Sequence, residues 1–201
     1  MFTLKRKFIS LLLVVILSAI FTNYLQAKEE PPKGQMVAEE DFENVVDNSW
    51  SDLILEEPAS SGAYYIEMTD VVNSWGAWGS KQDPYPDGTA WQDDAPLEKC
   101  DLKLRYRPIK GVGVFTDLIA IQAQGAIGDN WNPFQAWGDH TSLGQSFIAP
   151  EDFDAVSLDT PTWNTNNSGG KLTLYSQEAG KQAVVPQCKI AVTWGHIKAS
   201  D

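Results

Sequence analysis

The sequence has little cysteine, little histidine and little positive charge. Two cysteines in 201 residues are too few for a disulfide-dense scaffold or a four-cysteine zinc site. Lys and Arg number 15 and Asp and Glu 27, so the formal net charge is -12. A chain this acidic repels nucleic acid and anionic lipid surfaces, and we expect no nucleic-acid partner.

The motifs of several enzyme classes are also absent. The sequence contains no Gly-x-Ser-x-Gly, no glycine-rich phosphate loop and no Cys-x-x-Cys, which argues against a serine hydrolase, a nucleotide-binding protein and a dithiol redox protein. The only histidines, His140 and His196, lack the close spacing of a zinc site. These absences predict that the protein is not an enzyme of these classes.

One long apolar run is present, at the N-terminus. Basic residues 5–7 precede the apolar stretch 8–21, and small residues follow it, which is the pattern of a secretory signal peptide. We expect residues 1–27 to be removed, with an uncleaved anchor as the alternative. The sequence then predicts a polar lead-in at 28–36 and a single domain at 37–201. This domain is expected to be secreted, periplasmic or at the cell surface, without a membrane contact.

Export places the two cysteines in a setting where disulfides form. A bridge between Cys100 and Cys188 is the leading interpretation, because no other pair exists. Two buried thiols are the alternative.

The expected domain is typical of an all-β protein. Short alternating or β-branched runs are separated by turn residues, and residues 101–107 alternate strictly. No amphipathic helix of two turns is evident. Such a pattern favours an antiparallel β-sandwich. The expected strands are Ser51–Glu56, Tyr64–Thr69, Asp101–Arg107, Leu118–Ala123, Ser146–Ile148, Ala155–Asp159, Lys171–Ser176 and Lys189–Trp194.

Eight tryptophans are many for this length, and five of them fall in two long loops, at 73–99 and 124–145. Both loops also carry amides and carboxylates. Sugar rings offer C–H faces to aromatic side chains and hydroxyls to polar ones, so these loops are typical of a sugar-binding surface. The binding loops are expected at 73–94 and 129–140, although each tryptophan could instead anchor a loop to the core. The candidate ligand-binding residues are Trp75, Trp78, Tyr85, Trp91, Trp131, Trp137 and His140.

Two groups of motifs resemble a known family. Leu143-Gly-Gln-Ser-Phe-Ile-Ala-Pro with Gly170-Lys-Leu-Thr-Leu-Tyr looks like the first half of the galactose-binding-like jelly-roll domains of secreted carbohydrate-active proteins. Pro84-Tyr-Pro-Asp-Gly-Thr-Ala-Trp and Asp101-Leu-Lys-Leu-Arg are similar to the second half. The two halves stand in reversed order, which a circular permutation, a fragment of a tandem array or accidental similarity would each explain.

The resemblance implies a jelly-roll β-sandwich with an accessory role. Its partner would be a glycan or polysaccharide, a carbohydrate-active enzyme or a cell-surface protein. Domains of this class often hold a structural calcium, which needs six to eight oxygen ligands. The candidate ligands are Asp83, Asp87, Asp93, Asp94 and Asp101.

The sequence therefore predicts a secreted, non-catalytic carbohydrate-binding or accessory module whose loop aromatics stack on sugar rings. One alternative is a small jelly-roll glycoside hydrolase or polysaccharide lyase, which would use Glu67, expected to be buried or to face a cleft, and an aspartate of the long loops. The other is a cell-surface structural or adhesion protein whose tryptophans serve only packing.

Overall fold

The computed structural model describes residues 30–82, 85–111, 113–120 and 131–177. The expected signal peptide and the expected strand Lys189–Trp194 lie outside these ranges. Within them the chain forms strands and no helix, and accordingly no membrane-spanning helix is found there. The strands are β1 (Met36–Phe42), β2 (Ser49–Ala59), β3 (Gly62–Val72), β4 (Gly76–Ser80), β5 (Thr89–Gln92), β6 (Ala95–Pro96), β7 (Asp101–Leu102), β8 (Leu104–Pro108), β9 (Thr116–Ile119), β10 (Trp131–Gln135), β11 (Leu143–Ala149), β12 (Phe153–Thr160) and β13 (Gly169–Ser176).

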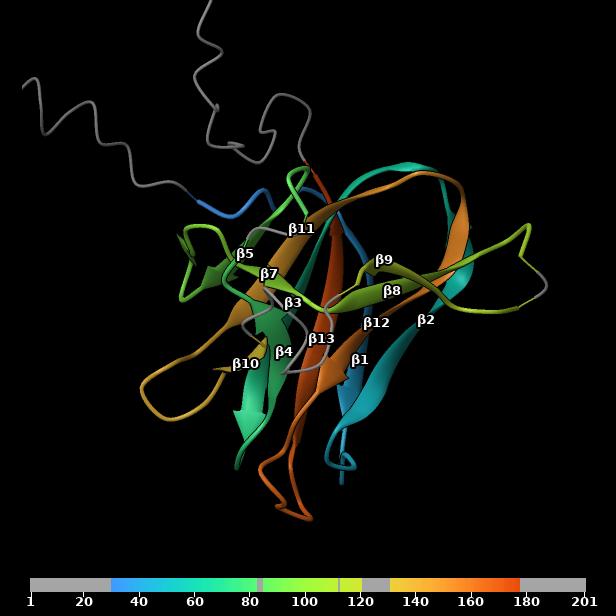
Figure 1. Cartoon of the computed structure of the whole chain (residues 1–201). Coiled ribbons are helices and arrows are strands. Elements are labelled where there is room, and N and C mark those ends of the chain that lie inside the picture. The colour runs from blue at the N-terminus through green and yellow to red at the C-terminus, as the bar shows by residue number, and fades with distance from the viewer. Residues whose placement is uncertain (1–29, 83–84, 112, 121–130, 178–201) are drawn as a thin grey trace, which may run out of the picture.

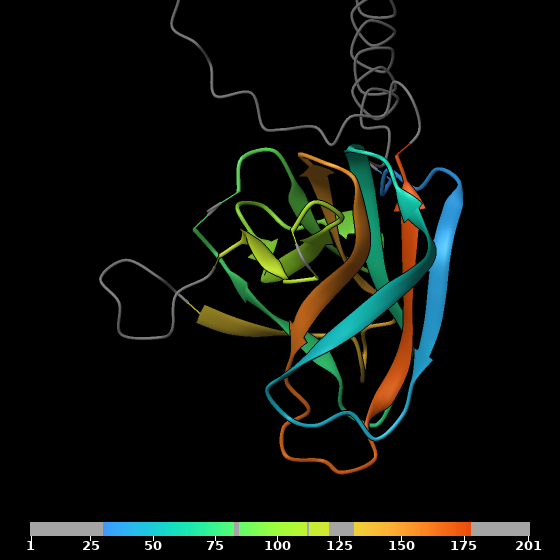
Figure 2. The same ribbon diagram turned by 90° about the vertical axis from the view of Figure 1, so that its right-hand side faces the viewer.

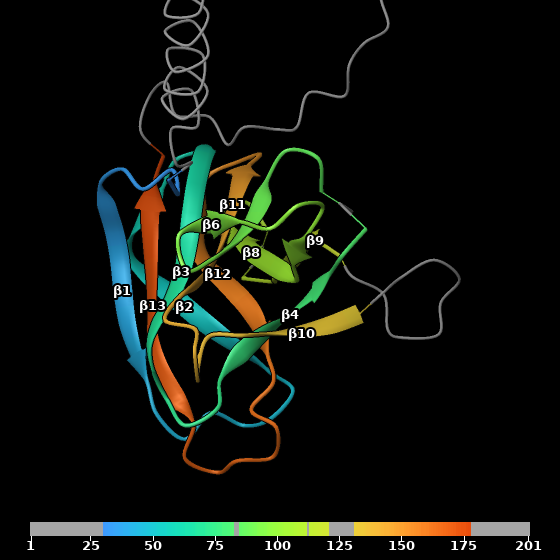
Figure 3. The ribbon, with the colours of Figure 1, turned by 90° about the vertical axis from the view of Figure 1, so that its left-hand side faces the viewer.

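The strands form three antiparallel sheets (Figure 1). The six-stranded sheet has the order β1-β13-β3-β11-β5-β6, the four-stranded sheet β2-β12-β8-β9, and the three-stranded sheet β10-β4-β7. The chain crosses between the two larger sheets from β1 to β2, from β2 to β3, from β11 to β12 and from β12 to β13. Figures 2 and 3 show these sheets packed against each other. The protein is an all-β antiparallel sandwich, as predicted, and its architecture is compatible with a jelly roll.

Alternation along β3 explains how the six-stranded sheet buries one face. Tyr64, Ile66 and Met68 point into the sandwich and belong to its core. Tyr65 and Glu67 alternate with them and therefore face the outer side of the sheet. Both are nevertheless buried, at 1% and 3% exposure. Other groups must therefore cover the outer face at this point.

An aromatic cluster joins the two larger sheets. Phe153 of the four-stranded sheet is fully buried, and its ring lies 5.0 Å from that of Tyr64 and 6.4 Å from that of Phe147, both on the six-stranded sheet. Tyr106 of β8 packs on the same ring, 6.4 Å away. Edge-to-face contacts of this kind stabilise a core beyond the area they bury.

The two regions expected as long loops differ from the prediction. Residues 73–99 contain β4, β5 and β6, and residues 124–145 contain β10, which pairs with β4, and the start of β11. β4, β5 and β10 have only four or five residues each, so the sequence shows no clear alternation. The edge strand β1 was also not expected, because most of its residues are exposed on both faces and no apolar period results.

Candidate functional site

Two of the candidate ligand-binding tryptophans are part of the packed interior. Trp75 is completely buried and lies 5.5 Å from the ring of Phe42. Trp91 is 4% exposed and meets the ring of Tyr65 edge to face at 6.5 Å. Neither ring presents an open face on which a sugar could stack.

Three other indoles are only half-buried and form what we call the indole cluster: Trp78, Trp137 and Trp163. The rings of Trp137 and Trp163 meet at 5.8 Å with an interplanar angle of 75°. Trp163 also covers Gly76, where a Cβ would lie 3.1 Å from its ring. Gly76 and Trp78 are two residues apart on β4 and so share one side of the strand. Trp78 therefore lies on the same side of β4 as the ring of Trp163, two residues farther along the strand.

The sequence analysis did not select Trp163, which follows β12. Its φ of 52° lies in the left-handed region, as does the φ of 61° at Asn164. Such a backbone costs a bulky residue about 1–2 kcal/mol, so the surrounding packing must hold it in place. The available signal was the position of this tryptophan directly before an asparagine-rich turn.

A depression of about 390 Å³ is lined by residues that are adjacent in sequence to Trp163 and to Asn48. The indole N–H of Trp78 donates to the side-chain oxygen of Asn48 at 3.0 Å, next to Asp47 on the rim. Asp47 accepts the backbone N–H of Thr162 at 2.6 Å, which joins the loop after β1 to the loop after β12. The depression is lined by Asn44, Val45, Val46, Asp47, Asn164, Thr165 and Asn166.

One donor in the indole cluster has no acceptor. The Nε1 atom of Trp137 is buried and has no hydrogen-bond partner among the described residues. Buried donors in folded proteins are nearly always paired. The buried Nε1 atoms of Trp75 and Trp91 are in the same state, so this feature does not by itself mark a ligand site.

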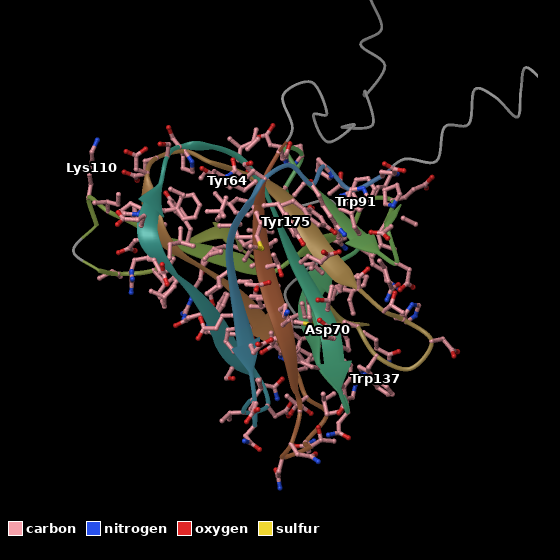
Figure 4. The ribbon with its side chains drawn as sticks, turned by 180° about the vertical axis from the view of Figure 1, so that it is seen from behind. Tyr64, Asp70, Trp91, Lys110, Trp137 and Tyr175 are labelled. Atoms are coloured by element: carbon pink, nitrogen blue, oxygen red, sulfur yellow. The ribbon has the colours of Figure 1, made fainter. Side chains whose placement is uncertain are left out.

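Asp93 and His140 hold the loop that carries Trp137. The carboxylate of Asp93 lies 2.6 Å from Nδ1 of His140 and accepts the backbone N–H of Thr141 at 2.7 Å. Desolvation by itself would raise the pKa of Asp93, but the hydrogen bonds from His140, Thr141 and Ser142 outweigh it and lower the pKa to about 2. The backbone N–H of His140 reaches the carbonyl of Trp137 at 3.4 Å. Asp93 and His140 therefore position the loop and, through it, Trp137, which is labelled in Figure 4.

The remaining aromatic candidates are Tyr85 and Trp131. Tyr85 is half-buried, and its hydroxyl accepts the N–H of Ile148 at 3.0 Å and donates to the carbonyl of the same residue at 3.3 Å. This pairing ties the chain before β5 to β11. The backbone of Trp131 begins β10, opposite Ser80, and its side chain is not described.

The calcium site expected from the resemblance has no counterpart in the described part of the chain. No group of three or more His, Cys, Asp or Glu side chains is placed there to hold a metal ion. Asp93 is held by His140, Asp94 pairs with Lys33, and Asp101 accepts the amide of Gln145. These carboxylates serve separate hydrogen bonds and ion pairs. The exposed Asp87 joins no such group, and Asp83 lies outside the described residues.

The cysteine prediction remains open. Cys100 is 8% exposed and its thiol lies 3.3 Å from the carbonyl oxygen of Glu98. Cys188 is outside the described residues, so the expected bridge stays a prediction.

The hydrolase alternative depends on the carboxylate of Glu67. Glu67 is buried, as expected, on the outer face of the six-stranded sheet, in the row where β3, β11 and β5 align it with Gly144 and Trp91. Its Oε1 atom forms an ion pair of 2.6 Å with Lys33. Asp94 joins the same lysine at 3.2 Å. A lysine thus lies between the two carboxylates where a hydrolase would need its substrate.

The fold and the indole cluster define a class: an antiparallel β-sandwich with partly exposed tryptophans beside a polar depression. No family model, no curated protein and no solved structure matches this chain. The resemblance to galactose-binding-like domains therefore remains a prediction about a chain whose architecture is compatible with it.

Proposed function

We propose that the protein is a secreted, non-catalytic module that binds carbohydrate at the indole cluster. One observation carries this proposal: the half-buried rings of Trp137 and Trp163 are in contact, and the half-buried Trp78 bonds Asn48. Asn164 follows Trp163 and Asp47 precedes Asn48, and both line a depression that also contains the side chains of Asn44 and Asn166. A sugar ring needs an aromatic face for its C–H groups and polar neighbours for its hydroxyls. The cluster offers both within one surface.

The chemistry of the cluster favours a neutral glycan. Indole faces bind through dispersion and C–H contacts, and the asparagine side chains exchange hydrogen bonds with hydroxyls in either direction. The net charge of -12 disfavours polyanionic polysaccharides. In this proposal the module brings a carbohydrate-active partner or a cell surface to its glycan. It uses no catalytic residue, metal or cofactor.

Binding of the full chain to an array of neutral and acidic glycans, followed by calorimetry with the best ligand, tests the proposal. We expect Trp78→Ala and Trp137→Ala to weaken binding about tenfold each, which corresponds to ~1.4 kcal/mol. Trp163→Ala should act similarly, because it removes the partner of Trp137.

Trp50→Ala is the matched control. Trp50 is also half-buried, but it lies on the four-stranded sheet, with the guanidinium of Arg105 4.2 Å from its ring centre. Glycan affinity should not change in this variant. The proposal fails if no glycan binds, or if binding survives loss of Trp78 and Trp137 in chains that remain folded by circular dichroism. Release of reducing sugar would overturn the non-catalytic assignment.

A further inference from the structure

The segment before β1 crosses the outer face of the six-stranded sheet. The N–H of Gly34 donates to the carbonyl of Ser176 at 2.7 Å, and the N–H of Ser176 donates to the carbonyl of Gln35 at 2.9 Å. These bonds extend the ladder between β1 and β13 beyond its last strand pair. Pro31 and Pro32 are buried, so the segment lies against the protein.

Lys33 reaches from this segment into a box of four side chains. Its ammonium lies 2.6 Å from Glu67 and 3.2 Å from Asp94. The ring centres of Tyr65 and Tyr175 are 5.9 and 6.0 Å from the same nitrogen. Two carboxylates and two aromatic rings are the usual surroundings of a bound ammonium ligand. We call these four residues the ammonium box.

The sheet itself holds the walls of the ammonium box. The register of β13 and β3 places Tyr175 opposite Tyr65, with ring centres 6.4 Å apart. The hydroxyl of Tyr65 lies directly over Gly144, where a Cβ would come within 2.1 Å of it. Trp91 closes the other side of the Tyr65 ring. These contacts come from strand pairing, so the two aromatic walls do not depend on Lys33.

The buried carboxylate of Glu67 makes a bound cation favourable in the ammonium box. Desolvation raises the pKa of Glu67, and Lys33 opposes this without cancelling it. A carboxylate that is 3% exposed is costly to leave without a partner. Removal of Lys33 therefore leaves a preformed site that favours another ammonium group.

We propose that the ammonium box and the adjoining edge of β13 form a binding site for an extended peptide with a lysine after two prolines, and that residues 31–35 fill it as a tethered ligand. The same segment of a second copy of this chain is the natural external occupant. Recognition combines an ammonium in the box with main-chain hydrogen bonds to Ser176, in the manner of strand addition. The proline pair restricts the free segment to extended conformations, which lowers the entropy lost on binding.

Because residues 31–35 are covalently attached to the domain, they compete with any free peptide for the ammonium box. A short linker gives an attached ligand an effective concentration on the order of millimolar. A free peptide of the same sequence must exceed that concentration to replace the segment in the native protein. A substitution that weakens the tethered ligand should therefore open the site to the free peptide.

The first experiment measures binding of acetyl-Pro-Pro-Lys-Gly-Gln-amide to full-length Lys33→Ala by calorimetry at pH 8. We expect Lys33→Ala to bind this peptide at least tenfold more tightly than the native chain does. Norleucine in place of the peptide's lysine should abolish binding, as should Glu67→Gln added to Lys33→Ala. The matched control is Lys110→Ala, which removes an exposed lysine far from the box (Figure 4) and should behave like the native chain.

The second experiment follows cleavage after Lys33 by a lysine-specific protease, read by mass spectrometry. Asp94→Asn should speed this cleavage several-fold, since it removes one partner of Lys33 at an exposed position that the fold does not need. An excess of the free peptide should also speed it in the native chain.

Several results would overturn the proposal. Equal binding of the peptide to the native chain and to a folded Lys33→Ala would do so, as would binding to neither. Tighter binding of glucosamine oligomers than of the peptide would assign the box to amino sugars instead. Unchanged cleavage in Asp94→Asn would show that Lys33 is not held by the box. None of these readouts involves the indole cluster, so the glycan proposal stands or falls separately.

Discussion

Asp93 shows how one side chain can organise two segments that are distant in sequence. It sits in the turn after β5 with a φ of 53°, a conformation that aspartate tolerates better than most residues. Its Oδ2 atom lies within hydrogen-bond distance of His140, and its Oδ1 atom accepts the backbone N–H groups of Thr141 and Ser142. The turn and the loop carrying Trp137 are thereby locked together.

The lowered pKa of Asp93 gives a pH-dependent prediction. Its contribution to stability is present above the unfolded value of 3.8 and is lost as the pH falls through about 2. Asp93→Asn should reduce the free energy of unfolding by about 1 kcal/mol at pH 7, a modest value because the carboxylate is partly exposed. The difference from the native chain should shrink below pH 3.8 and vanish near pH 2. Urea unfolding at several pH values measures it.

Asp87→Asn, at an exposed carboxylate before β5, is the control and should leave stability unchanged. A difference between Asp93→Asn and the native chain that persists undiminished at pH 2 would contradict the role given to the ionised carboxylate.

At the scale of single elements, β11 depends on one close approach. It runs between β3 and β5 and pairs with both. Its second residue, Gly144, lies under the hydroxyl of Tyr65, which leaves no space for a side chain. The approach allows Tyr65 to lie flat against the sheet and to form a wall of the ammonium box.

Gly144→Ala should therefore destabilise the protein by about 1–3 kcal/mol, the usual cost of overpacking a rigid site. Tyr65→Phe combined with Gly144→Ala should recover part of this loss, because it removes the nearest clashing atom. Thermal or denaturant unfolding provides the measurement. If Gly144→Ala is as stable as the native chain, Tyr65 is not fixed as described.

At the scale of the whole molecule, stability rests on the contact between the two larger sheets. Phe153 is at its centre, surrounded by rings from both sheets. Phe153→Ala should cost about 3–5 kcal/mol, because it removes apolar burial and leaves a cavity between the sheets. The matched variant Ile148→Ala, at an apolar side chain that is 44% exposed, should cost much less. Similar losses in the two variants would contradict this account of the core.

The net charge supplies a prediction that separates the two proposed binding sites. A lysine peptide approaches a chain of charge -12 and enters a box with two carboxylates, so its affinity should fall as salt screens these charges. A neutral glycan on the indole cluster should bind with nearly the same affinity at 50 mM and 500 mM salt. Calorimetry with each ligand at both salt concentrations tests this. A salt-sensitive glycan affinity would indicate a charged ligand group at the cluster.

Much of the fold could be predicted from local patterns. The alternation of residues 171–176 led to β13, and the turn residues between the strands indicated a sandwich. The run Asp101–Arg107, predicted as one strand, is divided in the structure into β7 and β8, which belong to different sheets. Strands such as β1 and β4 escaped prediction because their residues show no two-residue apolar period. An edge strand has little to bury, and β4 needs glycine at Gly79, where the ring of Phe134 leaves no room for a side chain.

By itself the sequence determined the all-β class and the acidic character, since composition and alternation are local properties of the chain. Only the tertiary structure decided which tryptophans are accessible. Trp75 and Trp78 lie in the same short stretch, yet one is in the core and the other at the surface. The pairing of the strands and the packing of the loops between them made that choice, and they also brought Lys33 to Glu67 and Trp163 to Trp137. Contacts between distant segments depend on how the sheets pair and pack, which no local pattern encodes.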